Sequence, residues 1–213
     1  MTVDDPTPRR GALGRGQRTR RQRDLLDGLQ ALFLAEGFRY LSLDVLAARL
    51  RCSKTTLYAL APSKEQLAVA VVTHYFKGAA ERIEAQIADV ADVRERIVCY
   101  LAAMGEEMQS ASADFIADVE AFDPARQIYE QNSRAAAERI HGLVAEGIAA
   151  GLFLDMHAAF VAEMVGATIA AIQRGEVRGR TGLTDGEAFT HLSSFVLSAL
   201  QPDVGGQDAT SAV

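Results

Sequence analysis

The sequence has few of the residues that would indicate a disulfide framework or a structural metal site. It contains 2 cysteines and 4 histidines among 213 residues. Cys52 and Cys99 lie in what we expect to be different domains, and no histidine stands beside either at the spacing of metal ligands. A reducing compartment, the cytoplasm, is the simplest expectation for such a chain.

Long hydrophobic runs are also missing. The most apolar stretch, residues 158–172, carries Glu163 and is shorter than the roughly 20 apolar residues that a membrane-spanning helix needs. The first twenty-odd residues hold charges and prolines but no apolar segment typical of a signal peptide. We therefore expect neither a membrane span nor secretion.

The motifs of the common catalytic classes are absent as well. The chain has no GxSxG motif, no glycine-rich phosphate loop and no Cys/His pair spaced for a nucleophile. Glu138 and His141 match the Glu-x-x-His pattern of di-iron bundles, but such sites need two of these pairs, and no other histidine follows a glutamate by three positions. We expect no enzyme, cofactor or metal, and we keep a metal-dependent helical-bundle enzyme as a remote alternative.

What the chain does have is an uneven distribution of charge. The net charge is −6, yet residues 1–67 hold 12 Lys and Arg against 7 Asp and Glu, whereas residues 68–213 hold 10 against 21. Seven of the cations are arginines between Arg9 and Arg23. A cluster of cations at one end of an acidic protein is typical of a surface that meets nucleic acid, although a solvated basic tail is the alternative.

The segment from Leu43 to Leu67 indicates a helix-turn-helix followed by a third helix. Ser42 and Ser53 each stand where a helix N-cap is expected, and Arg51 and Cys52 occupy the turn between the first two helices. Hydroxyl and amine donors fill the first turn after Ser53, while Leu57 and Leu60 are spaced to face inward. Donors at the N-terminus of a helix suit the DNA major groove.

Two motifs resemble those of the TetR family of transcriptional regulators. Thr56-Leu57-Tyr58 followed by Pro62-Ser63-Lys64-Glu65 and Leu67 is similar to the family's recognition-helix signature, with Gly37-Phe38 ahead of it. Further on, residues 146–153 are similar to the EGxxxGxF turn of the family's ligand-binding domains. The resemblance implies an all-α, dimeric regulator that binds an operator in double-stranded DNA and responds to a small-molecule effector, most often as a repressor.

The resemblance also implies roles for individual residues. Tyr58 and Lys64 would hold phosphates with help from Ser42, and Lys54, Thr55 and Thr56 would lie nearest the base edges. The full set expected at the DNA is Ser42, Arg51, Ser53, Lys54, Thr55, Thr56, Tyr58 and Lys64, with Arg18 and Arg20 of the basic segment.

The sequence departs from the family pattern at two places. Arg51 replaces the usual glycine of the turn, where φ is positive, and it is expected to reach a phosphate. Residues 59–61 are small and apolar where the family usually carries aromatic side chains. A helical adaptor that binds a protein partner and has lost DNA binding is therefore the main alternative function.

Helical signals predict about nine helices and no sheet. We expect a disordered basic arm over residues 1–17, a helix-turn-helix domain over 18–67, a ligand-binding and dimerisation domain over 68–202, and a flexible tail over 203–213. The first helix should begin at a capping box formed by Thr19 and Gln22 and end at Gly37, and a basic loop should follow Arg174.

The acidic domain offers candidates for an effector pocket and for a dimer interface. Aromatic and sulfur side chains of its middle helices are expected to line the pocket, although residues of this kind at helical spacing more often belong to an ordinary core; they are Phe76, Tyr100, Met104, Met108, Phe115 and Tyr129. Small residues over 158–171, including Gly166 and Ala170, would let a helix of a second subunit approach closely, although packing within one chain would also explain them.

Overall fold

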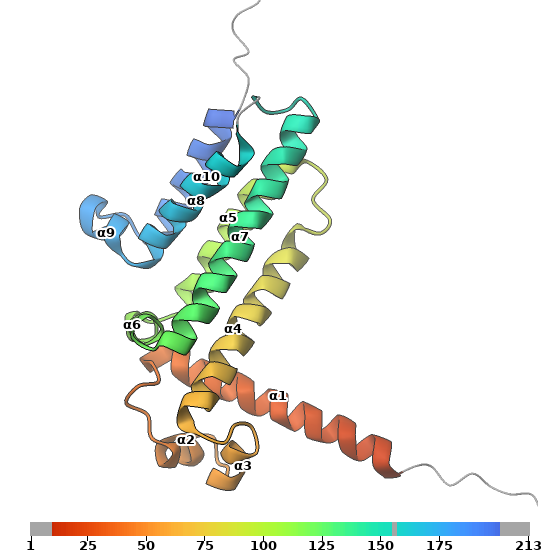
Figure 1. Cartoon of the computed structure of the whole chain (residues 1–213), viewed down its shortest axis with the longest axis vertical. Coiled ribbons are helices and arrows are strands. Elements are labelled where there is room, and N and C mark those ends of the chain that lie inside the picture. Colours follow the sequence, from red (N-terminus) through yellow and green to blue (C-terminus); the bar gives the residue numbers. More distant parts are fainter. Residues whose placement is uncertain (1–9, 155–156, 201–213) are drawn as a thin grey trace, which may run out of the picture.

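The computed structural model describes residues 10–154 and 157–200, which form ten α-helices and no strand. Figure 1 shows α1 and the short α2 and α3 at one end of an upright bundle made mainly of α4, α5, α7, α8 and α10. The bounds are α1 Arg10–Glu36, α2 Leu43–Arg49, α3 Lys54–Tyr58, α4 Lys64–Ile87, α5 Val93–Gln109, α6 Ala113–Ala121, α7 Asp123–Ala149, α8 Ala158–Gln173, α9 Glu176–Thr181 and α10 Asp185–Leu200. The all-α prediction is confirmed.

Two expectations about helix boundaries are wrong. The first helix begins at Arg10, not at the capping box of Thr19, so residues 10–17 are helical and not a disordered arm. Isolated glycines in this stretch lower helix propensity without removing backbone hydrogen bonds, and the prolines stand before Arg10. The segment after Arg174, expected to be a loop, contains α9, which raises the number of described helices from nine to ten.

Other expectations concern residues partly or wholly outside the described ranges. Residues 1–9 of the expected arm and the tail over 203–213 lie there. None of the helices within the described ranges is long and apolar enough to cross a membrane.

Side-chain caps begin most of the helices, as the sequence predicts. The Oγ atoms of Ser42, Ser53 and Ser63 accept from backbone N–H groups three residues later. Thr184 and Glu187 form the full reciprocal box at α10, because Glu187 Oε2 also accepts from the backbone of Thr184 at 2.8 Å. These caps satisfy donors that a helix leaves unpaired. Helix α7 differs, because it begins at Asp123 with Phe122 at the N-cap position and has no side-chain cap.

An apolar core joins the three N-terminal helices to α4 and α6. Its aromatic centre contains Phe38, whose ring centroid lies 5.4 Å from that of Phe33 and 6.3 Å from that of Phe115 on α6. Tyr75 of α4 packs edge-on against Phe115 at 5.6 Å. The core around the helix-turn-helix therefore depends on residues from α6, far along the chain.

A second core fills the bundle. It contains buried residues of α4, α5, α7, α8 and α10, and α4 contributes to both cores. The end of α7 is closed by Phe153, whose ring fills the place that a Cβ on Gly147 would take. Gly151 supplies the positive φ of the turn, at 69°. The EGxxxGxF motif is thus a tight helix end that returns the chain to the bundle.

Candidate nucleic-acid interface and pocket

The side chains on the polar edge of the short helix α3 differ in how strongly other groups of the domain hold them. Lys54 is exposed but its ammonium lies 2.6 Å from a carboxylate oxygen of Asp44 on α2. The Thr56 hydroxyl lies 2.9 Å from that of Ser53, which caps the helix. Thr55 and Tyr58 are exposed, and Leu57 is buried against the core. Among the candidate base-contacting side chains, Thr55 is therefore the one with the fewest hydrogen bonds and ion pairs to its own domain.

The turn between α2 and α3 has the left-handed backbone that the sequence predicts. Arg51 has φ of 49° and is the one non-glycine residue with positive φ among those described. A side chain in this conformation costs about 1 kcal/mol relative to glycine. The Arg51 side chain is exposed beside the recognition helix, where its guanidinium is free to meet a phosphate.

The loop between α1 and α2 adds residues that the sequence reasoning missed. Tyr40 is 88% exposed, and the Arg39 guanidinium carbon lies 5.8 Å from the centre of its ring. Lys64, at the start of α4, donates to the Arg39 carbonyl oxygen at 2.6 Å. Ser42, two residues after Tyr40, is also exposed. The one sequence signal for this surface was an aromatic residue placed between an arginine and a helix cap.

The expected arginines of α1 are only partly described. Arg20 is exposed on α1, and the side chain of Arg18 lies outside the part of the chain whose side chains are described. No group of three or more His, Cys, Asp and Glu side chains in the described ranges is placed to hold a metal ion.

A carboxylate of α6 connects the bundle to this surface. Asp118 Oδ2 accepts from the backbone N–H groups of Phe38 at 2.6 Å and Arg39 at 2.7 Å. A Cβ on Gly37, whose φ is 74°, would lie only 2.5 Å from the same oxygen. At the other end of α6, the backbone N–H of Ser112 donates to the Leu34 carbonyl at 2.8 Å. We call the contact between Asp118 and residues 37–39 the α6 latch.

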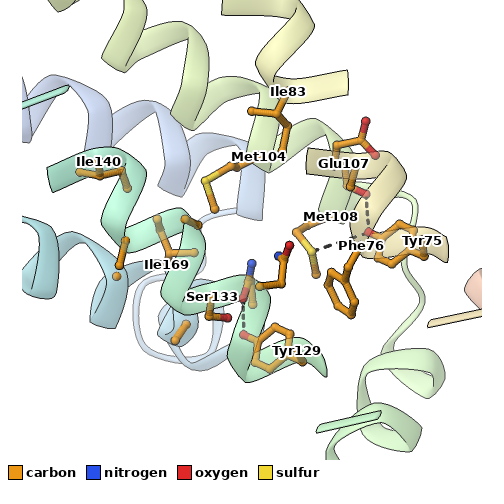
Figure 2. Close-up of a pocket in the computed structure, with 17 residues that line it drawn as sticks. Tyr75, Phe76, Ile83, Met104, Glu107, Met108, Tyr129, Ser133, Ile140 and Ile169 are labelled. Atoms are coloured by element: carbon orange, nitrogen blue, oxygen red, sulfur yellow. Dashed lines mark hydrogen bonds between the residues drawn. The ribbon is translucent and has the colours of Figure 1, made fainter. Parts of the chain in front are cut away.

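The bundle contains a pocket between α4, α5, α7 and α8, shown in Figure 2. Four of the six predicted pocket residues line it: Phe76, Met104, Met108 and Tyr129. The other two are misplaced, because Phe115 belongs to the core beneath the helix-turn-helix and Tyr100 is buried in the bundle core outside the pocket. The cavity is small, at about 50 Å³, which is room for a few water molecules.

Polar groups gather at the end of this pocket nearest the helix-turn-helix. The Tyr75 hydroxyl donates to the Glu107 carbonyl at 3.0 Å, and the Tyr129 hydroxyl donates to the side chain of Gln173. Burial raises the pKa of Tyr75 to about 12 and also raises the pKa of Tyr129. Both hydroxyls are therefore neutral donors at neutral pH. The carboxylate of Glu107 forms a two-bond ion pair with Arg82, at 2.7 Å for each bond.

The outer face of α8 and α10 exposes large apolar side chains. Phe160 is 60%, Met164 53% and Phe195 71% exposed. Gly166 and Ala170, expected on a face open to a second subunit, instead line the pocket facing α7. For Gly166 and Ala170 the structure therefore agrees with the alternative expectation, close packing against a helix of the same chain.

An all-α fold with a capped helix-turn-helix at one end and a pocketed bundle behind it defines a DNA-binding transcriptional regulator. Residues 25–71 match the family model described as "Bacterial regulatory proteins, tetR family", so this part of the chain is a TetR-type DNA-binding domain. Members of this family are DNA-binding regulators and not enzymes. A search of curated proteins found no match.

Solved structures share the whole fold at low sequence identity. A protein of Saccharomonospora viridis in complex with choline is 20% identical, with a TM-score of 0.74 over 86% of this chain and 99% of that one. A TetR transcription regulator of Haloarcula marismortui is 14% identical, with a TM-score of 0.72 over 86% and 100%. The regulator FadR of Bacillus subtilis, in complex with stearoyl-CoA, is 15% identical, with a TM-score of 0.64 over 82% and 97%. At these identities the likeness concerns the fold alone.

Proposed function

We propose that this regulator is a dimeric repressor whose operator affinity falls when a small molecule binds within the bundle. The observation that carries the proposal is the α6 latch, in which Asp118 holds the loop that leads into α2. A ligand changes such an equilibrium only through its different affinity for the two conformations. The latch supports a route by which that difference reaches the helix-turn-helix.

Two connections run from the pocket toward the DNA-binding surface. Met108 lines the pocket near the end of α5, and only four residues later Ser112 is bonded to α1. On the other side, α4 carries Phe76 in the pocket and Lys64 on the loop that holds Tyr40. Movement of α5 or α4 would therefore shift the surface that meets DNA.

We assign the DNA contacts in two groups. Groups along the domain's edge contact phosphates and set the register: Ser42, Arg51, Tyr58, Lys64, Arg18 and Arg20, joined by Arg39 and Tyr40. Lys54, Thr55 and Thr56 approach base edges, with Ser53 capping their helix. Phosphate contacts supply affinity for all sequences, and only base contacts select among them.

Dimerisation is assigned to the outer face of α8 and α10. Phe160, Met164 and Phe195 form an apolar surface that burial in an interface would remove from water. Helix-turn-helix proteins read two half-sites about one helical turn apart, so a two-fold dimer matches the operator's symmetry. Because its target is DNA, we place the protein in the cytoplasm.

A mobility-shift titration of the full chain against the DNA that flanks its gene tests the proposal. Retardation should be sequence-selective and should weaken steeply as salt rises, because bound phosphates release counterions. Binding that is absent, or equal for flanking and scrambled DNA, would favour the alternative of a protein-binding adaptor. Residues 59–61, small and apolar beside the recognition helix, are the feature that keeps that alternative in view.

A further inference from the structure

The bundle pocket is too small by itself to hold an effector. Its cavity measures about 50 Å³, whereas sites for small ligands usually span about 300–1,000 Å³. A second recess of about 320 Å³ lies between α6, the end of α8, and α9. We propose that the two form one composite site, which takes an amphipathic molecule with an uncharged polar head. This inference rests on the proposed function and deepens it.

The two cavities meet at two side chains. Met108 and Gln173 line both of them. Gln173 is held across the junction by its hydrogen bond from the Tyr129 hydroxyl. Methionine adapts its shape readily, and a ligand hydroxyl or amide can replace one partner in the Tyr129–Gln173 bond. A ligand can therefore pass between the cavities by moving two flexible side chains and without unfolding a helix.

The bundle pocket suits the apolar part of the ligand. Small residues of α7 and α8 leave its sides open, and bulky apolar residues close its far end. The small residues are Ala136, Ala137, Gly166 and Ala170, and the far end is formed by Ile83, Met104, Ile140 and Ile169. From Tyr129 to Ile140, α7 advances about 16 Å at its usual rise per residue. That shape favours a single narrow alkyl chain.

The charges around the recess are balanced, which sets the chemistry of the head. Glu176 pairs with Arg174 at 2.7 Å and with Arg180 at 3.1 Å, and Arg178 pairs with Asp185 at 3.1 Å. With the carboxylate of Glu120 on the α6 wall, three guanidinium groups stand beside three carboxylates. A charged head would upset this balance, whereas a hydroxyl or amide can add hydrogen bonds to groups of either sign. The recess is therefore suited to an uncharged polar group.

The recess also touches the helix that carries the latch. Its α6 wall is formed by Ala113, Ile116, Ala117 and Glu120. Asp118 follows Ala117 directly and holds the backbone of Phe38 and Arg39. A head group in the recess would press on α6 itself, so the composite site places the ligand in direct contact with the helix that contacts the DNA-binding domain.

Calorimetric binding of decanol to the full-length protein, against decanoate and decyltrimethylammonium, tests the chemistry. We expect saturable binding of decanol, at least about tenfold tighter than either charged analogue. Ala117→Trp should fill the recess from an exposed position and weaken decanol binding by about tenfold or more. Ala102→Trp is the matched control, because Ala102 is an exposed alanine on α5 that lines a different groove.

The variant Ala136→Phe tests the other cavity, because Ala136 lines the bundle pocket and does not line the recess. Loss of binding in both Ala136→Phe and Ala117→Trp, with Ala102→Trp unchanged, supports one composite site. Normal binding by Ala117→Trp, tighter binding of a charged analogue, or no saturable binding of any of the three overturns the inference. Operator binding measured on the same preparations separates that result from a failure of the proposed function, and circular dichroism confirms that each variant is folded.

Discussion

Asp118 Oδ2 lies 2.6 Å from the backbone nitrogen of Phe38, a residue 80 positions earlier in the chain. The same oxygen accepts from Arg39 at 2.7 Å, so one carboxylate holds two consecutive amides of the loop before α2. Hydrogen bonds to a charged acceptor are stronger than neutral ones. This contact makes the position of α6 and the position of the helix-turn-helix depend on each other.

Replacing Asp118 should loosen this dependence. Asp118→Ala leaves two amides without their acceptor, and we expect the free energy of unfolding to fall by about 1–2 kcal/mol. Amide hydrogen exchange at Phe38 and Arg39 should accelerate. Asp118→Asn keeps an acceptor oxygen and should restore most of the loss, and Asp114→Ala, an exposed position on the same helix, is the control. Unchanged exchange at both amides in Asp118→Ala would show that the latch is not formed in solution.

Gly37 is required for two separable reasons. Its φ of 74° disfavours any side chain, and a Cβ there would lie 2.5 Å from the Asp118 carboxylate. We expect Gly37→Ala to lower the free energy of unfolding by about 2–3 kcal/mol. Gly151→Ala isolates the first reason, because Gly151 has φ of 69° and open space around its Cα, and it should cost about 1 kcal/mol. If urea unfolding shows that Gly37→Ala and Gly151→Ala lose the same free energy of unfolding, the contact with Asp118 is contradicted.

Substitutions in the recognition helix should separate base contacts from phosphate contacts. Thr55→Ala should change which base pairs are preferred, because a good base contact contributes about 1–3 kcal/mol of discrimination. Lys64→Ala should weaken binding to all sequences alike, since we assign it to a phosphate. Selection from randomised operators measures both effects. A Thr55 variant with the wild-type preference would mean that the recognition helix is assigned to the wrong residues.

Asp44 should restrain Lys54 at the DNA surface. The two groups lie 2.6 Å apart, and hydrogen bonding to the Asp44 carboxylate raises the pKa of Lys54. Asp44→Asn should free this ammonium to reach a base edge, so the discrimination between the operator and other sequences should rise by about 1–3 kcal/mol. Scrambled DNA should gain less affinity than the operator does. The double variant Asp44→Asn with Lys54→Ala should lose this gain in affinity. If the gain persists in the double variant, it comes from removing the Asp44 charge and not from Lys54.

The outer face of α8 and α10 should hold the dimer together. Phe195 is 71% exposed in the single chain, and Phe195→Arg would bury an unpaired charge in an interface there. Light scattering should give about twice the chain mass of 22.9 kDa for the wild type and about that mass for the variant. Ala102→Arg adds the same charge at an exposed position on α5 and should remain dimeric. If the wild type is monomeric in solution, the assignment of this face as a dimer interface is wrong.

The sequence by itself determined the local features of this protein. Ser42, Ser53 and Ser63 each accept from a backbone N–H three residues later, and the turn at Arg51 has positive φ, as predicted. These features depend on residues within one helical turn of each other, so the chain's own order specifies them. The helix-turn-helix follows from them, and the helical signals along the rest of the chain indicate the all-α class.

Only the tertiary structure decided which apolar faces meet. Helical periodicity indicates that Phe115, Tyr100 and Gly166 lie on packed faces of their helices. It does not indicate which neighbouring helix each of them contacts. Phe115 lies beneath the helix-turn-helix, and Gly166 faces a pocket within the chain instead of a second subunit. The bond from Phe38 to Asp118 joins residues 80 positions apart, and no local pattern marks such a pair, because its geometry is set by the packing of α6 against α1.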